Sequence, residues 1–277
     1  MPLRDSFARY ARVLVGVGAI GVALGCASTA PRAPVPELVA GDPFRVPEAD
    51  FRRSVHRLCL DSLASEIALE DGDPRRSSFE ERIAERLEQA GFEVVGSKQT
   101  RAARAGIGEE PGEAFDPNTG RAIPGVALAF ASHVRERLAA TLECDAFVSI
   151  DLAIVQAFWD DRLVFWDGRE VWADGQDDAD QVAIALRDAY IGGVRGWGAI
   201  PALSLHLAIR DREGRLIFLH AGGIQTVATL RNVPYQIRWD PLPDDRILVD
   251  AESNQAAIDL AVGPLDARPG RTMESEN

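Results

Sequence analysis

Two histidines in a strong hairpin pattern are the side chains whose type and spacing best suit metal chemistry. Apolar and polar residues alternate from Leu203 to Gly223 on both sides of the turn Asp211–Gly214, which is the period of a half-buried strand pair. A three-residue loop with Gly214 in the left-handed position sets the apolar residues of the two strands against each other. That register places His206 directly opposite His220, whereas a slip of one residue would turn His220 onto the apolar face.

Two facing imidazoles suit zinc or copper, but a metal site needs three or four ligands. His56 and His133 have no spacing that brings them to the pair. The competing interpretation places one histidine partly under a helix and leaves the other in solvent. An envelope hydrolase or a metal-dependent enzyme is an alternative function if dispersed residues, such as His206, His220 and Asp151, converge in a cleft.

The sequence carries no catalytic signature. The G-x-S-x-G nucleophile motif, the H-E-x-x-H zinc motif and the G-K-[ST] phosphate loop are missing. Gly16–Gly21 matches the G-x-G-x-x-G dinucleotide motif, but that motif requires a strand before it and a helix after it, and here it lies in an apolar leader. The sequence therefore predicts a protein without enzymatic activity and without a cofactor.

Two cysteines, Cys59 and Cys144, lie in or beside predicted strands. Exported proteins meet oxidising conditions, and adjacent strands bring Cα atoms within the ~7 Å that a disulfide requires. We expect either a disulfide between these residues or two buried thiols. A nucleophilic role is not expected, because neither cysteine has a recognisable base near it in the sequence.

An aromatic-rich stretch contains Trp159, Trp166 and Trp172. Exposed rings of this kind stack on glycans or anchor a protein partner. On that interpretation the chain would be a glycan-binding or peptidoglycan-binding module. Packing of the tryptophans in the core is the more common outcome.

Residues 1–25 have the organisation of a secretory signal peptide. Met1–Arg12 is basic and Val13–Gly25 is an uncharged apolar run, too short to span a bilayer comfortably because spanning takes about 20 apolar residues. The end of this run, Val22–Cys26, resembles the lipobox of bacterial lipoproteins. The resemblance implies that the signal is cleaved and that Cys26 becomes a lipidated, palmitate-bearing N-terminus. A soluble secreted protein with a chance cysteine is the alternative.

Residues 26–50 are rich in alanine, proline and valine. Repeated proline blocks helix and sheet hydrogen bonding, so the segment is predicted to be a semi-extended tether. By resemblance to exported lipoproteins, Ala27 rather than aspartate after Cys26 favours the periplasmic face of the outer membrane.

The chain of 277 residues has a formal charge of −13 and is 46% hydrophobic. This content is enough for one domain of roughly 200 residues with its own core. The acidic balance argues against nucleic acid as a partner, because proteins that bind it usually carry a basic surface. The expected partners are the membrane, through the N-terminal lipid, and other envelope proteins.

Residues 51–265 are predicted to form one α/β domain, followed by a disordered tail at 266–277. Helices and hairpins that share one mixed sheet make a two-layer sandwich with the helices packed on one face. The expected elements are strands at Val55–Leu63, Phe92–Gly96 and Cys144–Phe158, hairpins at Leu163–Trp172 and Leu203–Ala221, a helix capped by Ser78, helices at Val126–Glu143, Asp178–Tyr190 and Ala256–Leu265, and an irregular stretch at Thr100–Gly125.

The order of these elements resembles a family of proteobacterial periplasmic lipoproteins. Their domain is like the N-terminal domain of TolB and the curli-secretion lipoprotein. The resemblance covers Phe51 to Leu265 and implies a non-enzymatic assembly or transport accessory role in the envelope, exercised through protein–protein contacts. It is carried by Ala90–Val94, Trp166–Gly168, Leu203–Leu205 and Gly222–Gln225.

Overall fold

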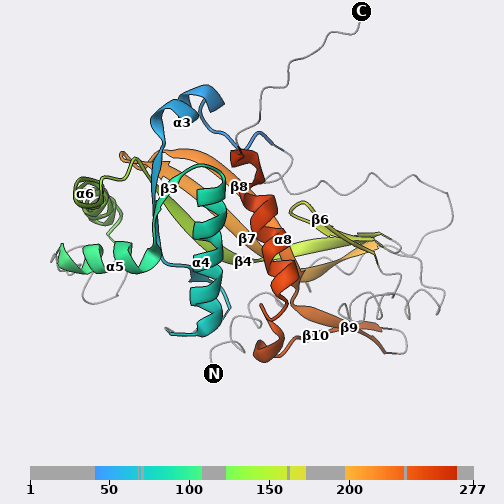
Figure 1. The fold of residues 1–277 in the computed structure, drawn as a ribbon. Coiled ribbons are helices and arrows are strands. Elements are labelled where there is room, and N and C mark those ends of the chain that lie inside the picture. Colours follow the sequence, from blue (N-terminus) through green and yellow to red (C-terminus); the bar gives the residue numbers. More distant parts are fainter. Residues whose placement is uncertain are drawn as a thin grey trace, which may run out of the picture.

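A curled mixed sheet lies at the centre of the molecule (Figure 1). The computed structural model describes residues 41–67, 69, 72–107, 123–160, 163–172, 197–233 and 236–266. Its two longest strands, β4 (Ala146–Asp160) and β7 (Trp197–Asp211), pair antiparallel from end to end. They form the axis to which the other strands of the sheet are added.

Shorter strands extend the sheet on both sides of this axis. They are β1 (Arg57–Leu60), β2 (Ala64–Ser65), β3 (Glu93–Val95), β5 (Leu163–Trp166), β6 (Arg169–Trp172) and β8 (Leu216–Thr226). β8 pairs antiparallel with β7, whereas β1 and β2 run parallel to β4 and β3 runs parallel to β1. The β5–β6 hairpin adds to the far end of β4. A separate two-stranded sheet joins β9 (Ala228–Val233) to β10 (Gln236–Pro241).

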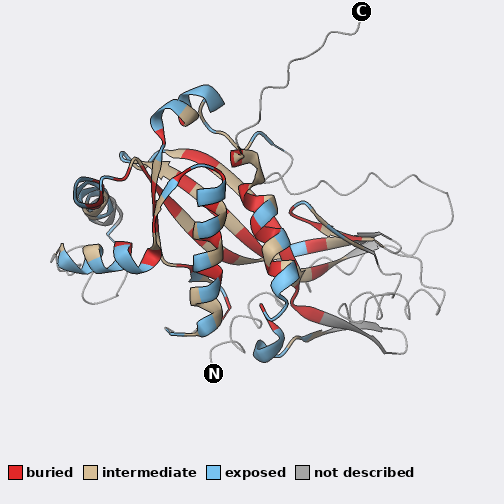
Figure 2. Ribbon diagram, in the orientation of Figure 1, coloured by how far each residue is buried: buried red, intermediate tan, exposed pale blue. Residues whose placement is uncertain are grey.

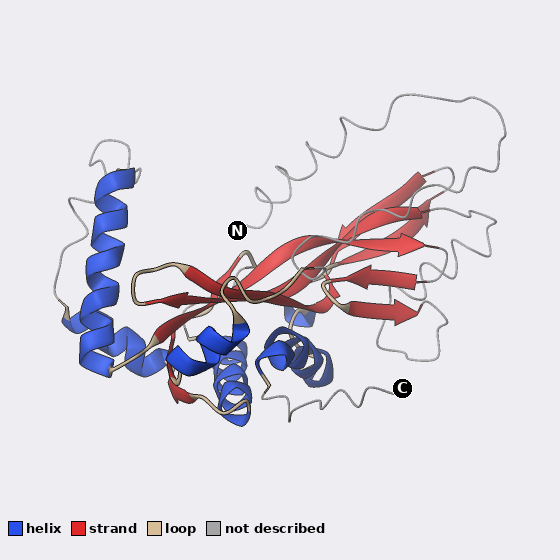
Figure 3. Cartoon of the chain, turned by 90° about the horizontal axis from the view of Figure 1, so that it is seen from above, coloured by secondary structure: helices blue, strands red, loops and turns tan. Residues whose placement is uncertain are grey.

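Helices cover the two faces of the sheet unequally (Figure 3). The helical elements are α3 (Glu48–Ser54), α4 (Pro74–Gln89), α5 (Ser97–Gly106), α6 (Pro124–Leu142), α8 (Ala251–Val262) and the short turns η2 (Asp244–Arg246) and η3 (Gly263–Leu265). α3, α4 and α8 pack on one face, where side chains such as Ile83 and Ile258 belong to the same main core as Val148. α5 and α6 pack at one end of the opposite face, over Cys59 and Phe147. Buried residues concentrate along the central strands and on α8 (Figure 2).

The predicted fold class is confirmed, because a mixed sheet carries helices packed on it. The sequence predicts helices on one face only, and α5 and α6 add a partial layer on the other. Part of α5 lies in the stretch predicted to be irregular. The helix follows β3 directly and is held by the buried side chains of Ser97 and Thr100, which are tertiary contacts that local periodicity does not report. The β9–β10 hairpin and α3 are not predicted by the sequence pattern either.

Helix α4 begins at Pro74, four residues before Ser78, the start of the predicted capping box. Its N-cap is Asp73, whose carboxylate accepts a hydrogen bond from the amide of Arg75, and Pro74 occupies the first helical turn, where its missing amide costs nothing. The predicted end of the helix is confirmed, since Gly91 has φ +98°. The turn Asp167–Gly168 also has the positive φ angles expected of a two-residue hairpin loop.

The β7–β8 hairpin forms as predicted. The predicted register is correct for the pair next to the turn and wrong for the pairs beyond it. Arg210 pairs with Leu216, and an irregularity next to the turn then shifts the pairing by one residue, so that Leu207 faces His220. An extra residue in one strand is a β-bulge, and it turns the side chains that follow to the other face, up to a second irregularity between Leu203 and Ser204. The bulge places Phe218 in the main core.

The segment just before α3 explains why this register is stable. Phe44 packs edge-on against Phe218 with ring centroids 5.3 Å apart, and the two segments form a β-bridge. The amide of Arg45 donates to the carbonyl of Ile217, and the amide of Leu219 donates to the carbonyl of Pro43, each at 2.9 Å. Residues 43–50, which the sequence assigns to the tether, therefore belong to the folded domain.

Several predicted segments lie outside the described residues. They are the signal peptide at 1–25, the first part of the tether, the helix Asp178–Tyr190 and residues 267–277 of the tail. The last helix, α8, is described and begins earlier than predicted, at Ala251, because Asp250 caps it by accepting from the amide of Glu252.

Two adjacent glycines in β8 allow close packing on both of its faces. A Cβ atom on Gly222 would overlap the carbonyl oxygen of Ala257, so the backbone of α8 lies directly on the strand there. A Cβ atom on Gly223 would come within 2.6 Å of the indole Nε1 of Trp166 on the other face. That indole donates to the carbonyl of Leu203 at 3.3 Å. The glycine pair thus fixes how closely α8 and the β5–β6 hairpin approach the sheet.

Substitution Gly222→Ala is expected to lower the free energy of unfolding by about 1–3 kcal/mol, because overpacking forces backbone shifts. Urea denaturation measures this loss. Gly106→Ala is the matched control, since a Cβ atom there meets no atom within 4 Å and alanine favours a helix by up to about 1 kcal/mol over glycine. Equal urea midpoints for Gly222→Ala and the parent chain would contradict the packing described.

Candidate functional site

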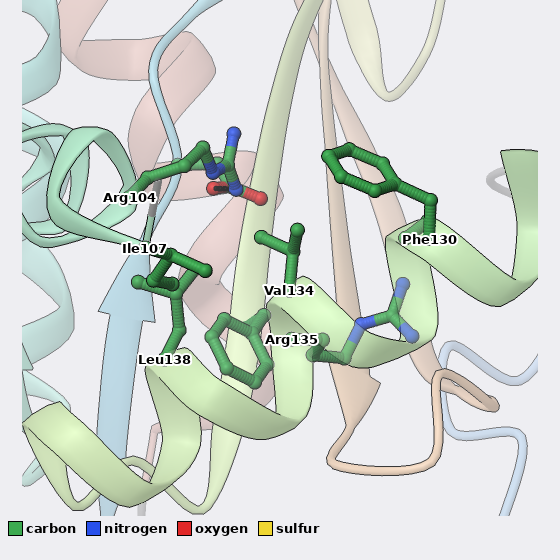
Figure 4. Close-up of a pocket in the computed structure, with 9 residues that line it drawn as sticks. Arg104, Ile107, Phe130, Val134, Arg135 and Leu138 are labelled. Atoms are coloured by element: carbon green, nitrogen blue, oxygen red, sulfur yellow. Dashed lines mark hydrogen bonds and ion pairs between the residues drawn. The ribbon is translucent and has the colours of Figure 1, made fainter. Parts of the chain in front are cut away.

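A pocket of about 320 Å³ lies between α5, α6 and the sheet face that these helices cover (Figure 4). Its volume is at the lower end of the range of small-molecule sites, about 300–1,000 Å³. The lining residues are Asp61, Arg104, Ile107, Phe130, Ala131, Val134, Arg135, Leu138 and Phe147. Apolar side chains therefore form most of the lining, and charged groups occupy a few positions.

The apolar lining follows from the spacing of residues on α6. Phe130, Val134 and Leu138 recur every four residues and so lie on one side of the helix. Leu138 and Phe147 of β4 are buried and belong to the small core on this face, with Val134 and Ile107 packed against them. The pocket thus opens above the outer edge of a packed apolar cluster.

Two arginines and one carboxylate supply the charges of the pocket. The guanidinium of Arg104 is 2.5 Å from a carboxylate oxygen of Asp61. Burial raises the pKa of Asp61, and the positive charges of Arg104 and Arg135 oppose this rise. The net charge contributed by the three groups is positive when all are ionised.

Arg135 is positioned by the β7–β8 turn. Its guanidinium lies over Gly214, whose φ is +85°, in space that a Cβ atom on this residue would occupy. Over the ranges that the structure describes, no carboxylate lies within ion-pair distance of Arg135. In Figure 4, Arg104 of α5 and Arg135 of α6 extend on opposite sides of Val134.

The pocket could not be located from the sequence. Arg104 lies in a stretch predicted to be irregular, and Arg135 is one of several arginines on a helix surface. The four-residue spacing of Val134 and Leu138 signals only that one side of α6 is apolar. What brings α5 beside α6 is tertiary packing.

The predicted cysteine pair lies in the core beneath this pocket. The structure joins Cys59 of β1 to Cys144, just before β4, with their Cα atoms 5.7 Å apart. Both residues are fully buried. They belong to the same apolar cluster as Leu138 and Phe147, so the bond ties β1 to the α6–β4 connection.

The predicted pairing of His206 with His220 is wrong. Because of the bulge, His206 faces Ala221 and His220 faces Leu207, so the two imidazoles lie on opposite faces of the sheet. The Nδ1 atom of His220 is 3.0 Å from the carbonyl oxygen of Leu260 in α8. Burial lowers the pKa of His220, and this hydrogen bond partly opposes the shift.

The residues of the enzyme alternative are only partly brought together. Asp151 of β4 is directly opposite His206 in the β4–β7 register, and the Nε2 atom of His206 is 3.7 Å from a carboxylate oxygen of Asp167. His220 lies on the other face, under α8. Within the described ranges, no three histidine, cysteine or acidic residues are grouped as a metal site would require.

The remaining site predictions have separate outcomes. Trp166 is 2% exposed, so its ring cannot contact a glycan or a partner. The guanidinium carbon of Arg169 lies over this ring, 5.7 Å from its centroid. The side chains of Trp159 and Trp172 are outside what the structure describes, as is Cys26. No helix among the residues described is both long and apolar enough to cross a membrane.

Comparisons with known proteins give distant structural similarity alone. No protein-family model matches the chain, and no curated protein matches its sequence. A lipoprotein from Neisseria meningitidis, GNA1162, is similar with 13% identity and a TM-score of 0.31, covering 61% of this chain and 81% of that one. A PelC dodecamer from Paraburkholderia phytofirmans has 13% identity and a TM-score of 0.31, with 78% and 90% covered. At this level of similarity, neither protein's properties transfer to this chain.

The buried His220 predicts a stability that falls with acid. Its lowered pKa means that the unfolded chain binds a proton more readily than the folded chain, so stability is constant above the ordinary value of 6.5 and falls as the pH drops below it. His220→Gln removes the titrating group and is expected to remove this part of the loss. Urea unfolding between about pH 5 and pH 8 measures it, with exposed His56→Gln as control. An unchanged pH slope in His220→Gln would contradict the burial effect.

The disulfide predicts a redox-dependent stability. A bond across a sequence separation of 85 is expected to contribute about 2–4 kcal/mol. Reductant should therefore lower the urea midpoint of the parent chain and leave that of the double variant Cys59→Ala, Cys144→Ala unchanged. If reductant has no effect on the parent chain, the two residues are free thiols.

Proposed function

We propose that this chain is a lipid-anchored protein of the bacterial envelope whose α/β domain acts as a non-enzymatic assembly or transport accessory through protein–protein contacts. The observation that carries the proposal is the leader that ends in VALGC at Cys26, followed by a proline-rich segment. A basic segment, a short apolar run and a small residue before the cut are the parts of a secretory signal, and the ending at Cys26 resembles the lipobox of bacterial lipoproteins. The proposal places the domain at the periplasmic face of the outer membrane.

The Cys59–Cys144 pair supports export of the domain. Structural disulfides persist in oxidising compartments such as the periplasm and are rare in the cytosol. The two sulfurs lie in a fully buried cluster of the fold, where a bond would serve stability rather than redox catalysis. The periplasmic location and the disulfide are therefore mutually consistent.

The length of the tether sets how far the domain extends from the membrane. Among the residues that the structure describes, Pro43 is the first that hydrogen bonds to β8, so the proposed tether is counted from Ala27 to Asp42. An extended proline-rich segment of this length reaches about 50 Å at ~3.1 Å per residue. Because residues 43–45 hydrogen bond to β8, the proposed tether would join the domain at the β8 edge of its sheet.

Protein contact is favoured over the two alternative functions by the placement of their residues. The enzyme alternative depends on His206, His220 and Asp151, and His220 lies on the opposite sheet face from the other two. The glycan alternative depends on exposed tryptophans, and Trp166 is in the core. The acidic chain, with a formal charge of −13, suits a partner surface that is basic.

Substitution Cys26→Ser is expected to abolish incorporation of radiolabelled palmitate and to release the protein from the membrane fraction, because serine lacks the acyl-accepting thiol. Gel autoradiography and cell fractionation measure the two effects. Cys59→Ser is the control that keeps the label. Undiminished labelling of Cys26→Ser would remove the anchor, and with it the proposed location.

A further inference from the structure

The pocket between α5 and α6 has the chemistry of a ligand site that the lipid anchor does not use. We propose that it binds a small amphipathic anion, which is an apolar chain that ends in a single carboxylate or phosphate group. The apolar chain would lie against Val134, Leu138 and Phe147, and the anionic group would meet the guanidinium of Arg135. This inference goes beyond the proposed function and holds whether or not the chain is lipidated.

The deepest part of the pocket is apolar and closely packed. Leu138 and Phe147 are 1% and 4% exposed, and they are packed into the cluster that contains the Cys59–Cys144 pair. Side chains that are already packed in a core lose little further freedom when an alkyl chain binds against them. Ile107 and Val134 continue this surface outward, and Phe130 and Ala131 flank it on α6.

The charges of the pocket select an anion. Asp61 is already paired with Arg104 at 2.5 Å, so neither group is free for a ligand of opposite sign. Arg135 has no carboxylate within ion-pair distance among the residues with described positions, and its planar fork suits the two oxygens of a carboxylate or phosphate. A cation would meet two guanidinium groups and one neutralised carboxylate, which disfavours it.

The guanidinium of Arg135 packs against the β7–β8 turn. It lies over Gly214, in space that any larger residue would fill. The carbonyl of Gly214 accepts from Arg210 at 3.2 Å, which holds the turn itself. Contact with the turn limits the positions open to the Arg135 guanidinium, so less side-chain entropy is lost when an anion binds to it.

Isothermal titration of the purified full chain tests the inference. The probes are decanoate and decyl phosphate, which share a tail and differ in the anionic group, with decanol and decyltrimethylammonium as neutral and cationic counterparts. We expect saturable binding of one or both anions to one site. The other two probes should bind at least tenfold more weakly, which is the loss of affinity expected when one charge-assisted hydrogen bond is missing. Comparison of the two anions distinguishes a carboxylate source from a phosphate source.

Matched variants place the binding in this pocket. Arg135→Gln should weaken binding of the preferred anion about tenfold, and Arg137→Gln, which removes the same charge from an exposed position of α6 outside the pocket, should leave it unchanged. Ala131→Phe fills the pocket from its edge and should abolish binding while the thermal midpoint stays near that of the parent chain. The apolar leader is common to all four proteins, so its contribution cancels.

Three results would overturn the inference. Equal affinity for decanol and decanoate would show an apolar cavity without charge selection. Equal losses in Arg135→Gln and Arg137→Gln would show general electrostatic attraction rather than a site. Failure of both anions to bind the parent chain, while palmitate labelling at Cys26 is intact, would refute the pocket and leave the proposed function standing.

Discussion

The enclosure of strand β8 is the constraint on which the rest of the domain depends. Its inner edge pairs with β7, and its outer edge is closed by residues 43–45 at one end and by the carbonyl of Asp167, which accepts from the amide of Gly223, at the other. α8 and Trp166 pack directly on the glycine pair from its two faces. An unpaired strand edge invites association with other chains, and here two separate parts of the sequence, residues 43–45 and Asp167, cover that edge.

The two faces of the sheet carry different parts of the molecule. The face under α3, α4 and α8 holds the main core, and it also contains His220, whose pKa is lowered by burial. The opposite face carries the smaller cluster with Cys59 and Cys144 and the pocket above it. Stability therefore resides mainly on one face, and the binding chemistry that we propose resides on the other.

Local sequence patterns were sufficient for elements whose limits are set by their own residues. Gly91 ends α4 and Asp167–Gly168 closes a hairpin because these positions require positive φ angles. The β7–β8 register is different, since it depends on Phe44, more than 170 residues away in the sequence, packing on Phe218. For the same reason the sequence suggested a histidine pair that the bulge separates, and it gave no sign that Arg104 and Arg135 share a pocket.

Amide hydrogen exchange of β8 in the full chain tests this account most directly. The account predicts that the amides of Leu219 and Gly223, which bond to residues outside the β7–β8 ladder, exchange as slowly as the ladder amides of β7. Those bonds break only when the N-terminal segment or the β5–β6 hairpin detaches. Rapid exchange of both amides, at the rate of an open edge strand, would contradict the enclosure of β8 and the register that follows from it.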